Sequence, residues 1–162
     1  MGSAAESVVI PTSVAEVWDF YFEPSTWPAW VDGFGGVDEA EGDYPQAGGT
    51  LRWHSTPAGR GEVTERVLEH EPRRLHAIEF ADPESTGTMV TTFEIVTEGD
   101  GEEGRAAGTR VTQEMDYKAR SRGPLGPLTD ILFVRSQVQR SLARSLERLR
   151  YEFEEVEAER AL

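Results

Sequence analysis

Hydrophobic and polar residues change their spacing twice along the chain, which divides it into three parts. The first part begins with a β-branched stretch at residues 6–10 that predicts a short strand. Apolar residues three and four positions apart then predict two short helices, over residues 14–22 and 25–31. The first helix has a capping box, because Ser13 precedes Glu16 by three positions.

In the middle of the chain the spacing becomes two, which is typical of antiparallel strands with one face in water. The alternation is clearest near its end, where Val111, Gln113, Met115 and Tyr117 are expected to point inward. A loop rich in Gly and Glu is predicted over residues 98–108. Six strands are predicted in this part, over residues 37–41, 50–55, 62–69, 74–80, 89–97 and 109–117.

The last part is a long amphipathic helix over residues 128–157. Its apolar stripe contains Leu128, Ile131, Val138, Leu142, Leu146, Leu149, Phe153 and Val156. A long apolar stripe facing a sheet with one wet face predicts an α+β two-layer fold. We expect one domain over residues 1–162, with a core from about 5 to 157 and a curved antiparallel sheet of six to seven strands around the helix. Such a sheet leaves space beside a single helix, where a ligand fits.

Composition narrows the function. The chain has 162 residues and a formal net charge of −14, which disfavours binding to nucleic acid and to anionic membranes. It has no cysteine, so disulfides, thiolate catalysis and cysteine-ligated zinc are excluded. No apolar run is long enough for a membrane span, and the N-terminus lacks the pattern of a secretory signal. We therefore expect an acidic, soluble, cytoplasmic protein, either a monomer or a homodimer, without stable membrane insertion.

Several segments resemble the START-like (SRPBCC) superfamily, close to its polyketide cyclase/dehydrase branch. They are residues 7–10 (SVVI), 13–18 (SVAEVW), 27–30 (WPAW), 48–52 (GGTLR), 67–75 (VLEHEPRRL), 108–112 (GTRVT) and 146–149 (LERL). The resemblance covers nearly the whole chain and implies the helix-grip fold of the birch pollen allergen. It also implies a hydrophobic cavity between the sheet and the long helix. The superfamily shares no catalytic signature, so the resemblance carries over no catalytic residue.

The most informative single residue is Arg135, which interrupts the apolar stripe of the long helix. It either lies where the helix leaves the core and reaches water, or it faces the cavity and binds an anionic group. Glu65 shares a strand face with two valines, so it is either a cavity carboxylate with a raised pKa or a group on the outer face. Glu79 points inward in one register of its strand, with Leu75 and Ala77. In the other register His76, Ile78 and Phe80 point inward.

The remaining candidates for the cavity wall are aromatic, apolar or uncharged polar residues. Gln113 and Tyr117 need hydrogen-bond partners if buried, and either they pair with each other or a ligand serves them. The aromatic residues near the expected entrance either pack in the core or stack on a flat ligand. The full set of cavity candidates is Trp27, Trp30, Phe34, Trp53, Glu65, Met89, Thr91, Phe93, Gln113, Met115, Tyr117, Ile131, Arg135 and Val138.

Other kinds of chemistry find no support in the sequence. The histidines, His54, His70 and His76, do not have the spacing of a zinc site. No nucleophile elbow and no phosphate-binding glycine loop occur. We therefore expect no metal and no cofactor. The first hypothesis is a binding protein for a hydrophobic small molecule such as a lipid, a polyketide-like aromatic compound or a quinone. A cyclase or dehydrase using the same cavity and a partner-binding or co-chaperone-like module are the alternatives.

Overall fold

A computed structural model describes residues 1–98, 105–120 and 127–162 of the chain. Its elements are β1 (Gly2–Ile10), α1 (Val14–Tyr21), a 3-10 turn (Pro24–Thr26), α2 (Trp27–Trp30), β2 (Phe34–Glu41), β3 (Thr50–Ser55), β4 (Glu62–Glu71), β5 (Leu75–Ala81), β6 (Ser85–Glu98), β7 (Arg105–Ala119) and α3 (Pro127–Arg160). The predicted helix-grip fold is confirmed. Ser13 caps α1 by accepting a hydrogen bond from the Glu16 backbone N–H, as the capping box predicts.

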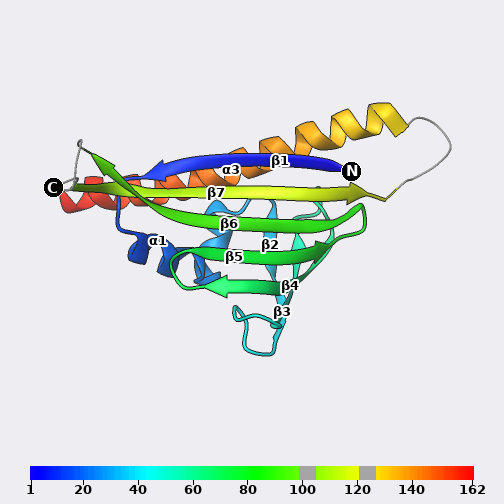
Figure 1. Ribbon diagram of the computed structural model, residues 1–162, viewed down its shortest axis with the longest axis horizontal. Helices are drawn as coiled ribbons and strands as arrows, with labels where there is room; N and C mark the ends of the chain where they lie inside the picture. The colour runs from blue at the N-terminus through cyan, green and yellow to red at the C-terminus, as the bar shows by residue number, and fades with distance from the viewer. Residues whose placement is uncertain (99–104, 121–126) are drawn as a thin grey trace.

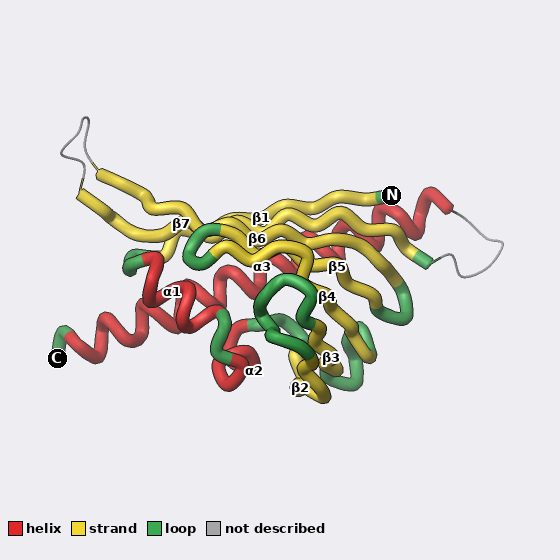
Figure 2. Tube along the Cα trace, turned by 60° about the horizontal axis from the view of Figure 1, so that its bottom comes forward, coloured by secondary structure: helices red, strands yellow, loops and turns green. Residues whose placement is uncertain are grey.

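The seven strands form one antiparallel sheet in the order β1-β7-β6-β5-β4-β3-β2. Figure 1 shows α3 running along the sheet beside β1 and β7. In Figure 2 the sheet curves over, and all the helices lie on its concave side. The helices therefore cover the inner face of the sheet.

The alternation along the strands sorts residues to the two faces of the sheet. Val111, Gln113, Met115 and Tyr117 are buried on the inner face of β7, as predicted. In β5 the second of the two alternative registers is the correct one. His76, Ile78 and Phe80 are buried and Glu79 is exposed, so Glu79 lies on the outer face.

The strands are longer than the sequence predicts, and glycines explain why. The strand predicted over residues 89–97 starts earlier, since β6 begins at Ser85 and pairs with β7 across Gly87. A Cβ at Gly87 would lie 2.1 Å from the Asp116 carbonyl oxygen, so only glycine allows this pairing. Likewise β2 begins at Phe34, and its first residues form a bulge opposite His54. The expected loop over residues 98–108 is too long, because β7 begins at Arg105. Residues 99–104 lie outside the described part.

The apolar stripe of α3 packs on the sheet through its middle. Leu142, Leu146 and Leu149 are buried, and Val138 and Phe153 are partly buried. Val156 is 43% exposed, because the helix extends past the end of the core. The side chains of the stripe residues Leu128 and Ile131 lie outside the described part.

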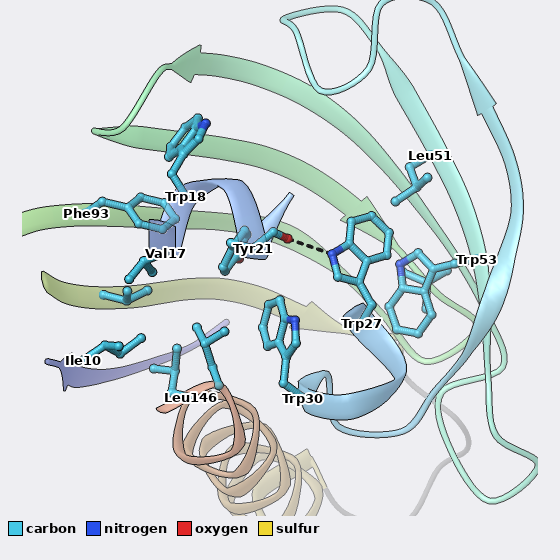
Figure 3. Packing of buried hydrophobic residues seen from close by; sticks show 13 residues of the cluster. Ile10, Val17, Trp18, Tyr21, Trp27, Trp30, Leu51, Trp53, Phe93 and Leu146 are labelled. Carbon is cyan, nitrogen blue, oxygen red and sulfur yellow. Dashed lines mark hydrogen bonds between the residues drawn. The ribbon is translucent and has the colours of Figure 1, made fainter. Parts of the chain in front are cut away.

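The main core cluster joins α1, α2, the sheet and α3. Its members, most of them labelled in Figure 3, are Ile10, Val17, Trp18, Tyr21, Trp27, Trp30, Leu51, Trp53, Val63, Phe93, Val111, Leu146 and Leu149. A smaller cluster of Ala4, Phe80, Met115, Tyr117 and Leu142 lies beneath the earlier part of α3. Residues of both clusters, such as Trp53 and Met115, have side chains on the inner side of the sheet.

Two histidines are built into the packing between α1 and the sheet. The His70 and His76 Nδ1 atoms, on β4 and β5, lie 3.0 Å apart in a hydrogen bond. The ring of Phe22 packs edge-on against both imidazoles. Burial lowers the pKa of His76 to about 3, so this imidazole is neutral in the folded protein at neutral pH.

The buried His76 predicts a loss of stability in acid. The unfolded chain protonates this histidine near its ordinary pKa of 6.5, whereas the folded chain does so near 3. Between these values the unfolded state binds more protons, so the free energy of unfolding falls as pH falls. We expect His76→Phe to reduce this slope, by at most about 1.4 kcal/mol per pH unit. Urea unfolding over a pH series measures it.

The exposed His54 provides the control for this experiment, since His54→Gln removes a histidine from the outer surface. His54→Gln is expected to keep the slope of the unmodified protein through the acid range. Parallel stability curves for the unmodified protein and His76→Phe would contradict the assignment.

Candidate ligand-binding cavity

A cavity of about 690 Å³ lies between the inner sheet face, α2 and α3. This volume is typical of sites for drug-sized molecules. The large aromatic and aliphatic residues of its wall are Tyr21, Trp27, Trp30, Phe34, Tyr44, Leu51, Trp53, Ile78, Phe80, Met89, Met115, Val134, Val138 and Leu142.

The short helix α2 places two indole rings at one side of the cavity. Trp27 donates from Nε1 to the Tyr21 carbonyl oxygen over 2.7 Å, the dashed line in Figure 3. Trp30 donates from Nε1 to Thr26 Oγ1 over 3.3 Å. Because both indole N–H groups already have partners, the rings present apolar surface to the interior.

Tyr44 brings a further ring to the wall from the β2–β3 loop. The two ends of this loop can pack against each other because position 49 is a glycine, where a Cβ would lie 2.7 Å from the Tyr44 backbone nitrogen. Burial raises the pKa of the Tyr44 phenol far above its ordinary range, so the group stays neutral.

Three polar side chains, of Tyr21, Thr91 and Gln113, form a hydrogen-bonded network between α1 and the inner face of the sheet. Gln113 donates from Nε2 to the Tyr21 hydroxyl over 2.9 Å, and this hydroxyl lies 3.1 Å from Thr91 Oγ1. Burial raises the pKa of Tyr21 to about 12. Of the two alternatives for Gln113, pairing with Tyr117 does not occur, because residues four apart on a strand are too far from each other, and Gln113 bonds to Tyr21 instead.

Glu65 is the carboxyl group of the cavity wall. It lies on the β4 face that also carries Val63 and Val67, both buried, so the inward alternative is correct. Trp53 donates from Nε1 to Glu65 Oε1 over 2.8 Å. Burial raises the pKa of this carboxyl, while the Trp53 hydrogen bond and the charge of Arg60 act in the opposite direction.

Ion pairs line the cavity where the loops meet α3. Asp32, just after α2, pairs with Arg144 at 3.2 Å and with Arg148 at 3.4 Å, and its backbone N–H donates to Ser145 Oγ over 2.9 Å. On the opposite side Arg60 donates from Nε and Nη2 to the buried Asp82. These contacts tie the α2–β2 segment to α3, and the β3–β4 loop to the β5–β6 turn.

The structure brings together many of the residues that the sequence singles out. Those on the cavity wall are Trp27, Trp30, Phe34, Trp53, Glu65, Met89, Gln113, Met115 and Val138.

The other candidates lie elsewhere. Thr91 and Phe93 are buried in the packing around Tyr21, and Tyr117 is buried in the smaller cluster. Arg135 is exposed on α3 and does not line the cavity. Of its two alternatives, the one in which the side chain reaches water is therefore correct. The side chain of Ile131 lies outside the described part.

Sequence reasoning missed several wall residues. Tyr44 belongs to a loop whose spacing gives no periodic signal, and only the adjacent Gly48-Gly49 pair hints at a close approach there. His76 was left undecided by the register of β5. The pairing of Asp32 with Arg144 joins residues distant in sequence and has no local signal.

The described residues form neither a metal-binding cluster nor a membrane-spanning helix. Within residues 1–98, 105–120 and 127–162, no group of three or more His, Asp or Glu side chains is arranged to hold a metal ion. Among the same residues, no helix has the length and apolar character needed to cross a membrane.

Comparison with solved structures supports the fold. The aromatase/cyclase ZhuI from Streptomyces sp. R1128 has a TM-score of 0.75 at 17% identity, with 94% of this chain and 93% of that chain covered. A protein from Rhodobacter sphaeroides gives 0.66 at 19% identity, covering 95% and 93%. BexL, a di-domain aromatase/cyclase from the BE-7585A biosynthetic pathway, gives 0.69 at 19% identity, covering 95% and 47%. At these identities the likeness shows the fold alone.

Comparison with sequences is more specific about ancestry. A search of curated proteins gives no significant match. The family model described as polyketide cyclase / dehydrase and lipid transport matches residues 1–154, which is nearly the whole chain. The chain therefore belongs to the polyketide cyclase/dehydrase and lipid transport family.

Proposed function

We propose that the protein binds a hydrophobic small molecule, of which a flat aromatic compound fits best, in the cavity between the sheet and α3. The observation that carries the proposal is the composition of the cavity wall. Rings of Trp27, Trp30, Phe34, Tyr44 and Trp53 surround a space of about 690 Å³. Aromatic walls bury a planar ligand and stack on it, which makes apolar burial the source of affinity.

Polar side chains also line the wall, and several of them are already engaged, since Arg60 binds Asp82 and Arg144 binds Asp32. Polar groups of this kind orient a ligand that apolar contacts hold. Glu65 and Tyr44 present oxygen atoms from one side, and Gln113 lies across the sheet on β7. Membership in a family described by polyketide cyclisation and lipid transport supports a hydrophobic ligand. The aromatic wall is our reason for proposing a flat aromatic compound within that class.

Filling the cavity is expected to abolish binding. Ser141 lines the cavity from α3, so Ser141→Trp would place an indole inside it. We expect the affinity for 2-acetylnaphthalene, measured by equilibrium dialysis, to fall at least about tenfold. Native mass spectrometry of the purified unmodified protein, before and after denaturation, tests in parallel for a retained ligand.

The matched control is Arg140→Trp, which adds the same ring at an exposed position one residue earlier on α3. This variant is expected to bind like the unmodified protein. Both variants need a thermal transition close to that of the unmodified protein. Equal affinities for Ser141→Trp and Arg140→Trp would place the binding site elsewhere.

A second candidate function is cyclisation of a polyketone with loss of water. Glu65 favours it, because burial raises the pKa of this carboxyl and so favours the protonated form that a general acid needs. Within a bound polyketone, an enol carbon would bond to a ketone carbon while Glu65 protonates the ketone oxygen. The enol would release its O–H proton to water and become a ketone, and Glu65 would take up a proton from water. In the dehydration, the new hydroxyl would leave as water with the Glu65 proton, and the adjacent carbon would give a proton back to the Glu65 carboxylate. The cavity wall would hold the two reacting carbons together.

Turnover of a linear β-polyketone thioester tests this second function. We expect an aromatic product, followed by absorbance and mass, with a rate that falls about 10²-fold or more in Glu65→Gln. Glu79→Gln, on the exposed outer face of β5, is the control and is expected to keep the full rate. Binding without any product would leave the carrier role as the function.

A further inference from the structure

We propose that Glu65 sets the chemical class of the ligand, by donating a hydrogen bond to a carbonyl oxygen, so that the cavity accepts neutral ketones or quinones and rejects carboxylates. The inference rests on the proposed binding function and adds the charge and the oxygen chemistry of the ligand to it. It identifies Glu65 as a specificity-determining residue, whether or not any reaction follows.

The two oxygens of Glu65 have different surroundings. Oε1 accepts the indole N–H of Trp53 over 2.8 Å. Oε2 has no hydrogen-bond partner among the described residues, on a side chain that lines the cavity. In the neutral acid, Oε1 is then the carbonyl oxygen and Oε2 carries the proton. A hydroxyl donor is therefore left for whatever occupies the cavity, and its natural partner is an acceptor oxygen.

The charges around the cavity disfavour an anionic ligand. The two arginines that line it already have partners, since Arg60 binds Asp82 and Arg144 binds Asp32. A carboxylate ligand would lose its hydration without gaining a free cation on the described wall, and such burial is costly. A neutral ketone loses much less, and it supplies the acceptor that Glu65 lacks.

The protonation states of the wall agree with this geometry. Burial raises the pKa of Glu65, which favours the neutral acid. Burial also raises the pKa of both tyrosines and lowers that of His76 to about 3, so these groups stay neutral near neutral pH. The titratable and charged residues that line the cavity are Tyr21 from α1, Asp32, Tyr44, Arg60, Glu65 from β4, His76 from β5, Asp82, Glu84 and Arg144 from α3.

Three probes of nearly equal shape test the proposal. 2-Acetylnaphthalene is neutral with a carbonyl oxygen, 2-ethylnaphthalene has no acceptor, and 2-naphthoate is anionic. We expect the ketone to bind about threefold to tenfold more tightly than the hydrocarbon, as one hydrogen bond provides. We expect the carboxylate to bind at least about tenfold more weakly than the ketone. Equilibrium dialysis of the intact protein measures all three.

A pH series separates the hydrogen bond from simple packing. The donor exists only while Glu65 is protonated, so affinity for the ketone is highest at low pH and falls as pH rises through the raised pKa of Glu65. The hydrocarbon has no such bond, so its affinity changes less over the same range. Glu65→Gln keeps an amide oxygen for Trp53 and an N–H donor for the ligand. This variant is expected to bind the ketone within about threefold of the unmodified protein, with no pH dependence.

Glu79→Gln, on the exposed outer face, is the control and keeps the pH dependence of the unmodified protein. The inference is overturned if the carboxylate binds as tightly as the ketone, or if Glu65→Gln retains the pH dependence. Equal binding of all three probes overturns it alone and leaves the binding function intact. Absence of binding by every probe overturns both.

Discussion

The cavity depends on a mismatch of width between one helix and seven strands. Strands lie about 4.8 Å apart, so seven of them span roughly 29 Å, whereas a helix with its side chains is about 10 Å wide. α3 can therefore cover only the strands nearest to it, and it lies beside β1 and β7 (Figure 1). The inner face of β2–β5 needs another cover. α1 and α2 provide part of it, and the remaining space is the cavity.

Most of this architecture follows from the sequence, because it rests on local periodicity. The alternation in β7 and the stripe of α3 each fix which face is buried, and both are confirmed at Met115 and Leu146. Strand ends are less predictable. At Gly87 a residue that normally marks a turn lies inside a strand, since the neighbouring backbone leaves no room for a Cβ. Local composition gives no sign of such a contact.

The candidate site was predictable only where a side chain's face is set by its own strand or helix. Glu65 and Gln113 were found in this way. Tyr44 was missed because a loop carries no period, and the pairing of Asp32 with Arg144 because it joins residues far apart in the chain. For Arg135 the sequence left both the cavity and the solvent open. The structure leaves its side chain exposed while the adjacent Val134 lines the cavity, since neighbouring positions on a helix point about 100° apart.

The carboxyl groups of the cavity wall differ in their partners. Two of the wall's carboxylates, Asp32 and Asp82, are engaged by arginines and hold the surrounding segments in place. Glu65 has no arginine within ion-pair distance, and its only hydrogen bond in the described structure comes from a neutral indole. Protonation lowers the cost of burying a carboxyl that has no cationic partner, and the raised pKa of Glu65 is a shift in that direction. In the proposal above, this acidic residue therefore acts toward the ligand as a hydrogen-bond donor.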